Sequence, residues 1–333
     1  MGNSPPCGTS SVIMSSVSSR AAGAIVGSFI ADAASLPVHW VYDQEKLAAE
    51  VSKHPTPEFL PEGICPYYKL PTGKNSAYGD HLYVLLKSVV ESKGFDAGSY
   101  KAGLKAMFGP GSAYDYQRPS GQAEGPYIHG YMKKYLANIA QDKEDTGDTG
   151  STDTDGVINS AVIVALYGGD PQMTSKLEEA VKVVQNTPIC IKYALTGAKL
   201  LEGLIMNGPN PNAVGDLKGL VDNDVAQEIS KAEDMKVQPH NDAAKKLGYA
   251  CSLPGGFLSM LHCLLNAKPG KFIESIRPTL LAGGDNCSRA AMLGAILGAQ
   301  MGLEGLPMDL LAKVERGQEV KALAEQLVAM RQS

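Results

Sequence analysis

The feature that most constrains the fold is a helical spacing of apolar residues that recurs along almost the whole chain. In the first stretch, Ala21, Ile25, Phe29 and Ala33 fall on one helical face, and the pattern ends before Pro37. Alternating strand patterns are nearly absent, and aromatic residues make up only 6% of the chain. The sequence therefore predicts an all-α protein, folded as one compact multi-helix domain. After the first stretch, helices are predicted over 80–93, 99–108, 125–140, 156–168, 172–186, 189–206, 222–235, 255–266, 270–282, 287–301 and 318–331.

Three stretches break the helical pattern. Residues 1–17 are rich in Ser, Gly and Pro, which predicts a flexible tail and places the folded domain at 18–333. Residues 52–76 contain five prolines and two glycines, which predicts a long ordered loop or flap. Residues 141–156 are acidic and almost free of apolar residues, so we expect them either to loop outward or to line a polar mouth.

Charge and cysteine content exclude several classes of protein. The net charge is −5 and no basic stripe occurs, which argues against a nucleic-acid partner. We find no run of about 18 apolar residues, so no membrane partner is expected. The six cysteines lie far apart without a CxxC pair, which argues against a disulfide scaffold or a zinc site. Reduced thiols and a cytoplasmic location follow as the expectation.

The most distinctive segment lies near the C-terminus. Residues 283–288 read Gly-Gly-Asp-Asn-Cys-Ser and open a helix in which Gly294 and Gly298 allow close contact with a neighbour. An Asp, Asn or Ser at such a position can cap the free backbone N–H groups, and Asp gains from the helix dipole. Taken alone, the pattern favours a capped and tightly packed core helix.

This segment resembles the C-terminal signature of the ADP-ribosylglycohydrolases, all-α proteins that hydrolyse the glycosidic bond joining ADP-ribose to a protein side chain. The usual form is Gly-Gly-Asp-Thr-Asp-Thr. Residues 283–285 match it, Ser288 replaces the last Thr, and Cys287 stands at the second Asp. Residues 20–39 resemble the first helix of the family, with His39 at the place of a common carboxylate.

A third segment, Ser/Thr-Asp-Asp-Thr in the family, supplies the other half of a two-magnesium site. Its counterpart by resemblance is residues 79–82, where Asp80 remains but His81 replaces the second Asp. Imidazole and thiol groups are poor ligands for magnesium. The resemblance therefore implies that the two-ion site is lost, with Asp80, Asp285 and Ser288 left as candidate ligands of one weakly held ion.

Residues 151–157, 251–257 and 284–290 resemble one branch of the family, the J-crystallins of jellyfish eye lenses and the related selenoprotein J group. This implies a soluble structural lens protein, monomeric, without cofactor, with an ADP-ribose-like molecule as its one candidate ligand. The alternative is an active magnesium-dependent ADP-ribosyl hydrolase with a rearranged site. That site would use Asp80, Asp285 and Asp153 or Asp155.

Three smaller signals each leave two interpretations. Asp153 and Asp155 are expected to cap the following helix rather than to form a calcium loop, and to face the cleft. Cys287 is either a buried inert thiol, which is favoured, or a redox-active group at a helix start. His81 beside Asp80 is expected to be satisfied separately from a capping Asp rather than to form an acid–base couple. The predicted vestigial cleft comprises Asp80, His81, Asp153, Asp155, Asp285, Asn286, Cys287 and Ser288.

Overall fold

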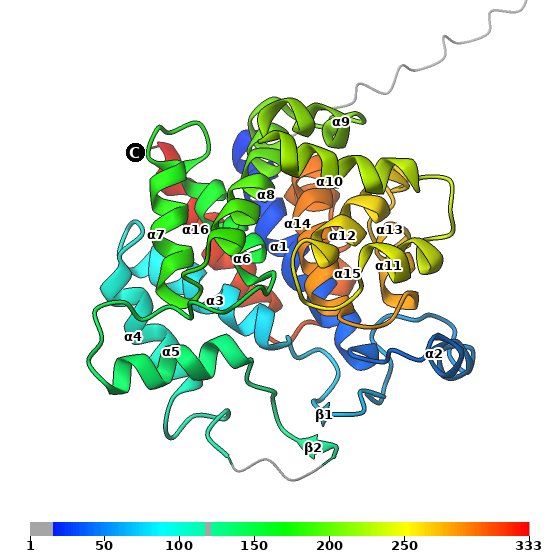
Figure 1. Ribbon diagram of the computed structural model, residues 1–333, viewed down its shortest axis with the longest axis horizontal. Coiled ribbons are helices and arrows are strands. Elements are labelled where there is room, and N and C mark those ends of the chain that lie inside the picture. Colours follow the sequence, from blue (N-terminus) through cyan, green and yellow to red (C-terminus); the bar gives the residue numbers. More distant parts are fainter. Residues whose placement is uncertain (1–15, 117–120, 333) are drawn as a thin grey trace, which may run out of the picture.

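The computed structural model describes residues 16–116 and 121–332, and its architecture is all-α (Figure 1). The α-helices are α1 (Val17–Ser35), α2 (Gln44–Val51), α3 (Ala77–Glu91), α4 (Ala97–Phe108), α5 (Gly130–Ala140), α6 (Asp155–Tyr167), α7 (Met173–Val184), α8 (Pro188–Asn207), α9 (Ala213–Leu217), α10 (Asn223–Asp234), α11 (His240–Leu247), α12 (Gly255–Leu265), α13 (Phe272–Leu281), α14 (Asn286–Met301), α15 (Met308–Leu311) and α16 (Gly317–Ala329). Short 3-10 helices are η1 (Leu36–Val38), η2 (Lys218–Leu220), η3 (Leu303–Gly305) and η4 (Met330–Gln332). Two strands, β1 (Tyr68–Lys69) and β2 (Ala123–Glu124), pair in parallel, with Tyr68 opposite Ala123.

Helix α1 forms the centre of the protein. Ser16 caps it by accepting a hydrogen bond from the Ser19 backbone N–H at 3.1 Å. The stretch Val17–Val38 has a mean hydropathy of 1.5 and is long and apolar enough to cross a membrane, yet it is buried inside the protein. The expectation that no such run occurs was therefore wrong for this stretch. A helix that is apolar on every side fits the core of a large domain, and α1 takes that role here.

Helices α1 and α14 cross with their backbones in close contact at the centre of the molecule (Figure 1). A Cβ atom placed on Gly298 would lie 2.0 Å from the Gly23 carbonyl oxygen, and one on Gly294 would lie 2.4 Å from the Gly27 oxygen. The close helix contact predicted from the small residues of these two helices is confirmed. This packing places the first turn of α14, with Asp285 as its cap, against the end of α1.

Each helix predicted after the first stretch is found, with ends that shift by a few residues. The largest shift is in α5, which begins at Gly130 rather than 125, because Gly125 has a φ of 110°, outside the helical region. Helices α2, α9, α11 and α15 were not predicted. The longest of them have 8 residues, too few for an apolar periodicity to stand out.

The segments that interrupt the helical pattern were predicted to be loops or a tail. Between residues 53 and 76 the chain forms no helix, and β1 is its one regular element. In the acidic segment, residues 141–145 are exposed, whereas Ser151 and Thr154 are buried, so the segment begins on the surface and enters the interior near its end. Most of the predicted tail, residues 1–15, lies outside the described residues, while Ser16 and Val17 belong to the start of α1.

Candidate functional site

The turn before α14 positions Asp285, the acid of the C-terminal signature. Gly283 and Gly284 have φ angles of 70° and 64°, which favour glycine. A Cβ on Gly283 would lie 2.3 Å from the Val41 carbonyl oxygen, and one on Gly284 would lie 2.3 Å from that of Tyr249. Both the backbone angles and the lack of space exclude a side chain at these two positions. The resulting tight turn places Asp285 as the N-cap of α14.

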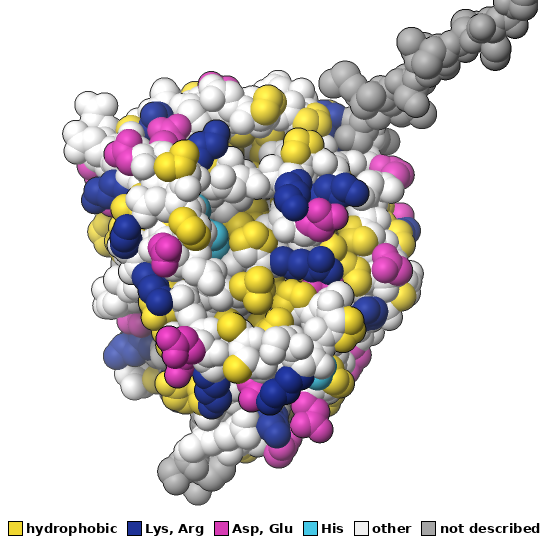
Figure 2. Space-filling view, turned by 90° about the vertical axis from the view of Figure 1, so that its right-hand side faces the viewer, with side chains coloured by type: hydrophobic (Ala, Val, Ile, Leu, Met, Phe, Trp, Pro, Cys, Tyr) yellow, Lys and Arg dark blue, Asp and Glu magenta, His cyan; other side chains and the backbone are white. Residues whose placement is uncertain are grey.

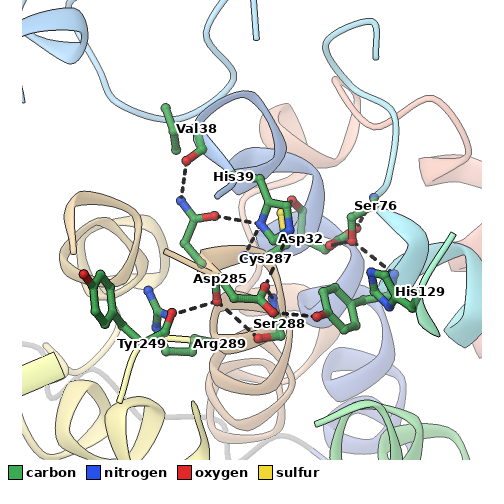
Figure 3. A network of polar contacts seen from close by, with 12 residues as sticks. Asp32, Val38, His39, Ser76, His129, Tyr249, Asp285, Cys287, Ser288 and Arg289 are labelled. Carbon is green, nitrogen blue, oxygen red and sulfur yellow. Dashed lines mark hydrogen bonds and ion pairs between the residues drawn. The ribbon is translucent and has the colours of Figure 1, made fainter. Parts of the chain in front are cut away.

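Asp285 is fully buried, and its carboxylate has partners in the protein (Figure 3). The hydroxyl of Tyr78 donates to Oδ2 at 2.5 Å, and the Ser288 backbone N–H donates to Oδ1 at 3.5 Å. His39 Nε2 lies 3.6 Å from Oδ1, and burial lowers the pKa of this histidine, which favours its neutral form. A phenol and an imidazole therefore lie against both oxygens of the acid that the family signature retains.

A buried arginine supports the same turn from the other side (Figure 3). Arg289 has no solvent exposure and donates to the backbone carbonyls of Tyr249 at 2.7 Å and Asp285 at 2.9 Å. It also donates to Thr279 Oγ1 at 3.1 Å and to the Gly283 carbonyl. Burial lowers the pKa of Arg289, and the nearby charge of Asp285 opposes that shift. The guanidinium thus holds the loop together and balances the buried carboxylate.

Asp32 forms a second anchored carboxylate that the predicted cleft did not include. Its Oδ2 accepts hydrogen bonds from Asn75 Nδ2 and the Ser76 N–H, both at 2.9 Å, and its Oδ1 accepts from Ser76 Oγ at 2.5 Å. Burial raises the pKa of Asp32 to about 6. A Cβ on Gly79 would lie 2.4 Å from Oδ2, so a side chain where the family has a hydroxyl would displace the Asp32 carboxylate. The sequence offered one signal for Asp32, namely that it is the only acid in a mostly apolar helix.

His81 belongs to a separate buried network centred on Asp155. His81 Nδ1 lies 3.5 Å from Asp155 Oδ1, and Tyr131 donates its hydroxyl to the same oxygen. His81 Nε2 contacts the Tyr100 hydroxyl at 2.5 Å, and Asn159 lies against the same ring. Burial lowers the pKa of His81 to about 3, so the ring is neutral. The expectation that His81 is satisfied independently of Asp80 agrees with this geometry.

Asp155 does not cap its helix as expected. Thr154 occupies the N-cap position of α6 without a side-chain hydrogen bond, and Gln185 Oε1 accepts from the Gly156 N–H at 3.0 Å. Asp155 instead points to Tyr131 and to His129, whose Nδ1 lies 3.9 Å away. Burial raises the pKa of Asp155 to about 6. The capping interpretation was wrong because a glutamine from the end of α7 satisfies the free amide.

Asp80 lies apart from both networks. Arg316 Nη1 is 2.6 Å from Asp80 Oδ1, and the Tyr114 hydroxyl donates to Oδ2 at 2.7 Å. Ser76, not Asp80, caps α3, so the predicted capping role of Asp80 was wrong. The structure brings Asp285, Asn286, Cys287 and Ser288 together at one turn, but it does not bring the Asp80 side chain to them.

Removing Arg316 is expected to leave the Asp80 carboxylate buried without its cation. Arg316→Gln should lower the free energy of unfolding by about 2 kcal/mol, a discounted value because this guanidinium is one-third exposed. Urea unfolding measures the loss. The double variant Asp80→Asn/Arg316→Gln should recover most of it, and strictly additive losses would contradict the pairing.

Asp153 lies at the inner end of the acidic segment. Its backbone forms an antiparallel bridge with Ser252, and its side chain is close to Cys251 and Asp155. Burial, followed by the charge of Asp155, raises the pKa of Asp153 to about 7. A carboxyl whose native pKa exceeds the ordinary value of 3.8 stabilises the fold at low pH, and this contribution is lost as the pH rises through about 7.

Replacing Asp153 with asparagine removes this pH dependence. Asp153→Asn is therefore expected to be more stable than the parent protein at pH 8, by about 1 kcal/mol or more, and to show little difference at pH 4. Urea unfolding at the two pH values measures it. Asp145→Asn, on the exposed part of the same segment, is the control and should change stability equally little at both.

Cys287 is buried in the first turn of α14. Burial raises the pKa of its thiol well above 9.0, with the charges of Asp32 and Asp285 adding to the shift. Of the two interpretations of Cys287, this environment favours the buried inert thiol over the redox-active group. Five cysteines are free within residues 16–116 and 121–332, namely Cys65, Cys190, Cys251, Cys263 and Cys287.

The donors do not fit a pair of magnesium ions. Asp285 is bonded by Tyr78, Asp80 is paired with Arg316, and Ser288 Oγ donates to the Asp285 backbone carbonyl at 3.2 Å. Across the described part of the chain, no group of three or more His, Cys, Asp or Glu side chains is arranged to hold a metal ion. Both carboxylates expected to bind metal therefore accept from protein donors, and the Ser288 hydroxyl is itself used as a donor to the backbone.

Comparison with known proteins settles the relationship. The family model described as ADP-ribosylglycohydrolase matches residues 14–333. The chain belongs to the ADP-ribosylglycohydrolase family. Two relatives from the jellyfish Tripedalia cystophora are Crystallin J1A, 36% identical over 93% of this chain and 97% of the relative, and Crystallin J1B, 33% identical over 94% and 98%. Both the family resemblance and the resemblance to J-crystallins are confirmed.

A solved structure supports the fold of this ADP-ribosylglycohydrolase family member. A chain from an "ADP-ribosylglycohydrolase-related protein complex" superposes with a TM-score of 0.64, covering 95% of this chain and 99% of that one. The two sequences are 19% identical, so the likeness concerns the all-α fold alone.

Proposed function

We propose that this protein is a structural eye-lens protein of the J-crystallin kind, descended from an ADP-ribosylglycohydrolase and without hydrolase activity. The relationship to Crystallin J1A and J1B along more than nine-tenths of the chain supports the class. The observation that carries the loss of catalysis is the hydrogen bond from the Tyr78 hydroxyl to Asp285. It engages one oxygen of the acid that the family signature retains, while His81 and Cys287 stand where the family has two further acids.

The surface suits a protein that works at high concentration. Figure 2 shows Lys and Arg side chains interspersed with Asp and Glu, with hydrophobic side chains between them. The net charge is −5, and the large apolar side chains exposed in the described residues are few: Tyr42, Tyr67, Leu220, Val237 and Met308. Mixed charge and a net charge away from zero favour solubility. We therefore propose a monomer in the cytoplasm, with no nucleic-acid or membrane partner and no cofactor.

Magnesium binding tests the proposal. A ligand present at 100 times its Kd would stabilise the native protein by about 2.7 kcal/mol. We expect no heat in calorimetry, no thermal shift at millimolar magnesium and no release of ADP-ribose from ADP-ribosylated protein. Binding of two ions together with turnover that chelation abolishes would favour the alternative hydrolase instead. Binding of ADP-ribose without turnover would leave the structural role in place.

A further inference from the structure

A groove of about 700 Å³ lies between α9, the end of α12 and the end of α14. Buried Val214, Leu264 and Leu297 line it, together with half-exposed Met301 and exposed Pro269. The volume is in the range of sites that hold small molecules or short peptide segments. Contiguous exposed apolar surfaces with polar residues at their rim often mark sites of interaction.

The first turn of α1 lies between the two chain segments that lead into this groove. The Ser19 hydroxyl accepts from the Leu303 N–H at 3.0 Å, two residues before Gly305, which lines the groove. On the other side, Arg20 Nε donates to the Ile205 carbonyl at 2.7 Å, and Pro209 lines the groove soon after it. Ser16 enters α1 in an extended conformation, with ψ of 163°. The start of α1 therefore lies beside the two segments that lead into the groove.

The sequence before Ser16 contains three consecutive bulky apolar residues, Val12, Ile13 and Met14, among Ser, Gly and Pro. They stand two to four residues from Ser16, and an extended chain spans about 7–14 Å over that separation. We propose that the segment 12–14 occupies this groove within the same molecule. By covering Val214, Leu264 and Leu297, it withholds an apolar surface from neighbouring molecules in a concentrated solution.

Substitutions in the segment test the proposal in the full chain. Ile13→Asp should raise the fluorescence of an apolar dye such as anilinonaphthalene sulfonate several-fold and speed amide hydrogen exchange at the end of α12. Ser10→Asp adds the same charge three residues away, outside the apolar run, and should leave both signals unchanged. Dye binding and exchange that are equal in all three proteins would overturn the proposal.

A substitution in the groove tests it from the other side. Ala267, after α12, is a half-exposed residue of the groove wall, and Ala267→Trp fills part of the groove. The substitution should release the segment, which is detected as faster proteolysis before Ser16. Lys87→Trp on α3 is the control and should leave proteolysis unchanged. Unchanged proteolysis would count against the proposal. Sedimentation distinguishes a second copy as occupant: if the parent protein is a dimer and Ile13→Asp is a monomer, the segment binds a neighbouring molecule and the intramolecular proposal is wrong.

Discussion

Arg289→Met is expected to lower the free energy of unfolding by about 4 kcal/mol, because a methionine leaves buried carbonyls without donors and Asp285 without its nearby cation. Arg289 is fully buried and binds the carbonyls of Tyr249, Gly283 and Asp285, which form the turn before α14. The packing of a long side chain is largely kept in methionine. The loss therefore reports on hydrogen bonding and charge rather than on a cavity.

Equilibrium urea unfolding measures the effect, and Arg331→Met is the matched control. Arg331 also binds backbone carbonyls, those of Ala165 and Gly168, both at 2.7 Å, but it is partly exposed, so water can replace its hydrogen bonds. The control should lose much less stability. If the two variants were equally stable, the buried guanidinium would not hold the turn in the way described.

The second large effect is expected at the crossing of α1 and α14. Gly298→Ala places a methyl group 2.0 Å from the Gly23 carbonyl oxygen and 2.6 Å from its carbonyl carbon, and both are backbone atoms that cannot rotate away. The helices must separate along much of their length, which should cost about 3 kcal/mol or more. Thermal unfolding should show a lower midpoint and a less cooperative transition.

Gly203→Ala on α8 is the control for this substitution. A Cβ at Gly203 meets no atom within 4 Å, and alanine is favoured over glycine in a helix by about 1 kcal/mol. Gly203→Ala should therefore be neutral or stabilising. A Gly298→Ala protein as stable as the parent would show that the two backbones are not in contact.

The sequence was sufficient for the fold, because long helices repeat their apolar face several times. It also indicated which residues meet at the start of α14, since Asp285, Asn286, Cys287 and Ser288 are neighbours in the chain. Short helices such as α2 and α11 gave no periodicity to read. Contacts between segments that are far apart in the chain could not be predicted, because no local pattern records them.

The partners of Asp285 and Asp80 illustrate that limit. Tyr78 is 207 residues from Asp285, and Arg316 is 236 residues from Asp80. The resemblance to the family named the acids but not the groups that bind them here. Asp32 is the one acid of α1 and Arg289 the one charged residue of α14, and both were missed as site residues because only packing shows what surrounds them.

The burial of α1 also affects how this chain is made. Helix α1 leaves the ribosome well before α14, against which its glycines pack, because α14 is completed some 265 residues after the end of α1. At about 5–20 residues per second, the nascent helix waits on the order of 10–50 s for that neighbour. Throughout this interval an apolar segment long enough to cross a bilayer lacks its main packing partner, and the helices made before α14, such as α6 and α8, are the ones that can cover it.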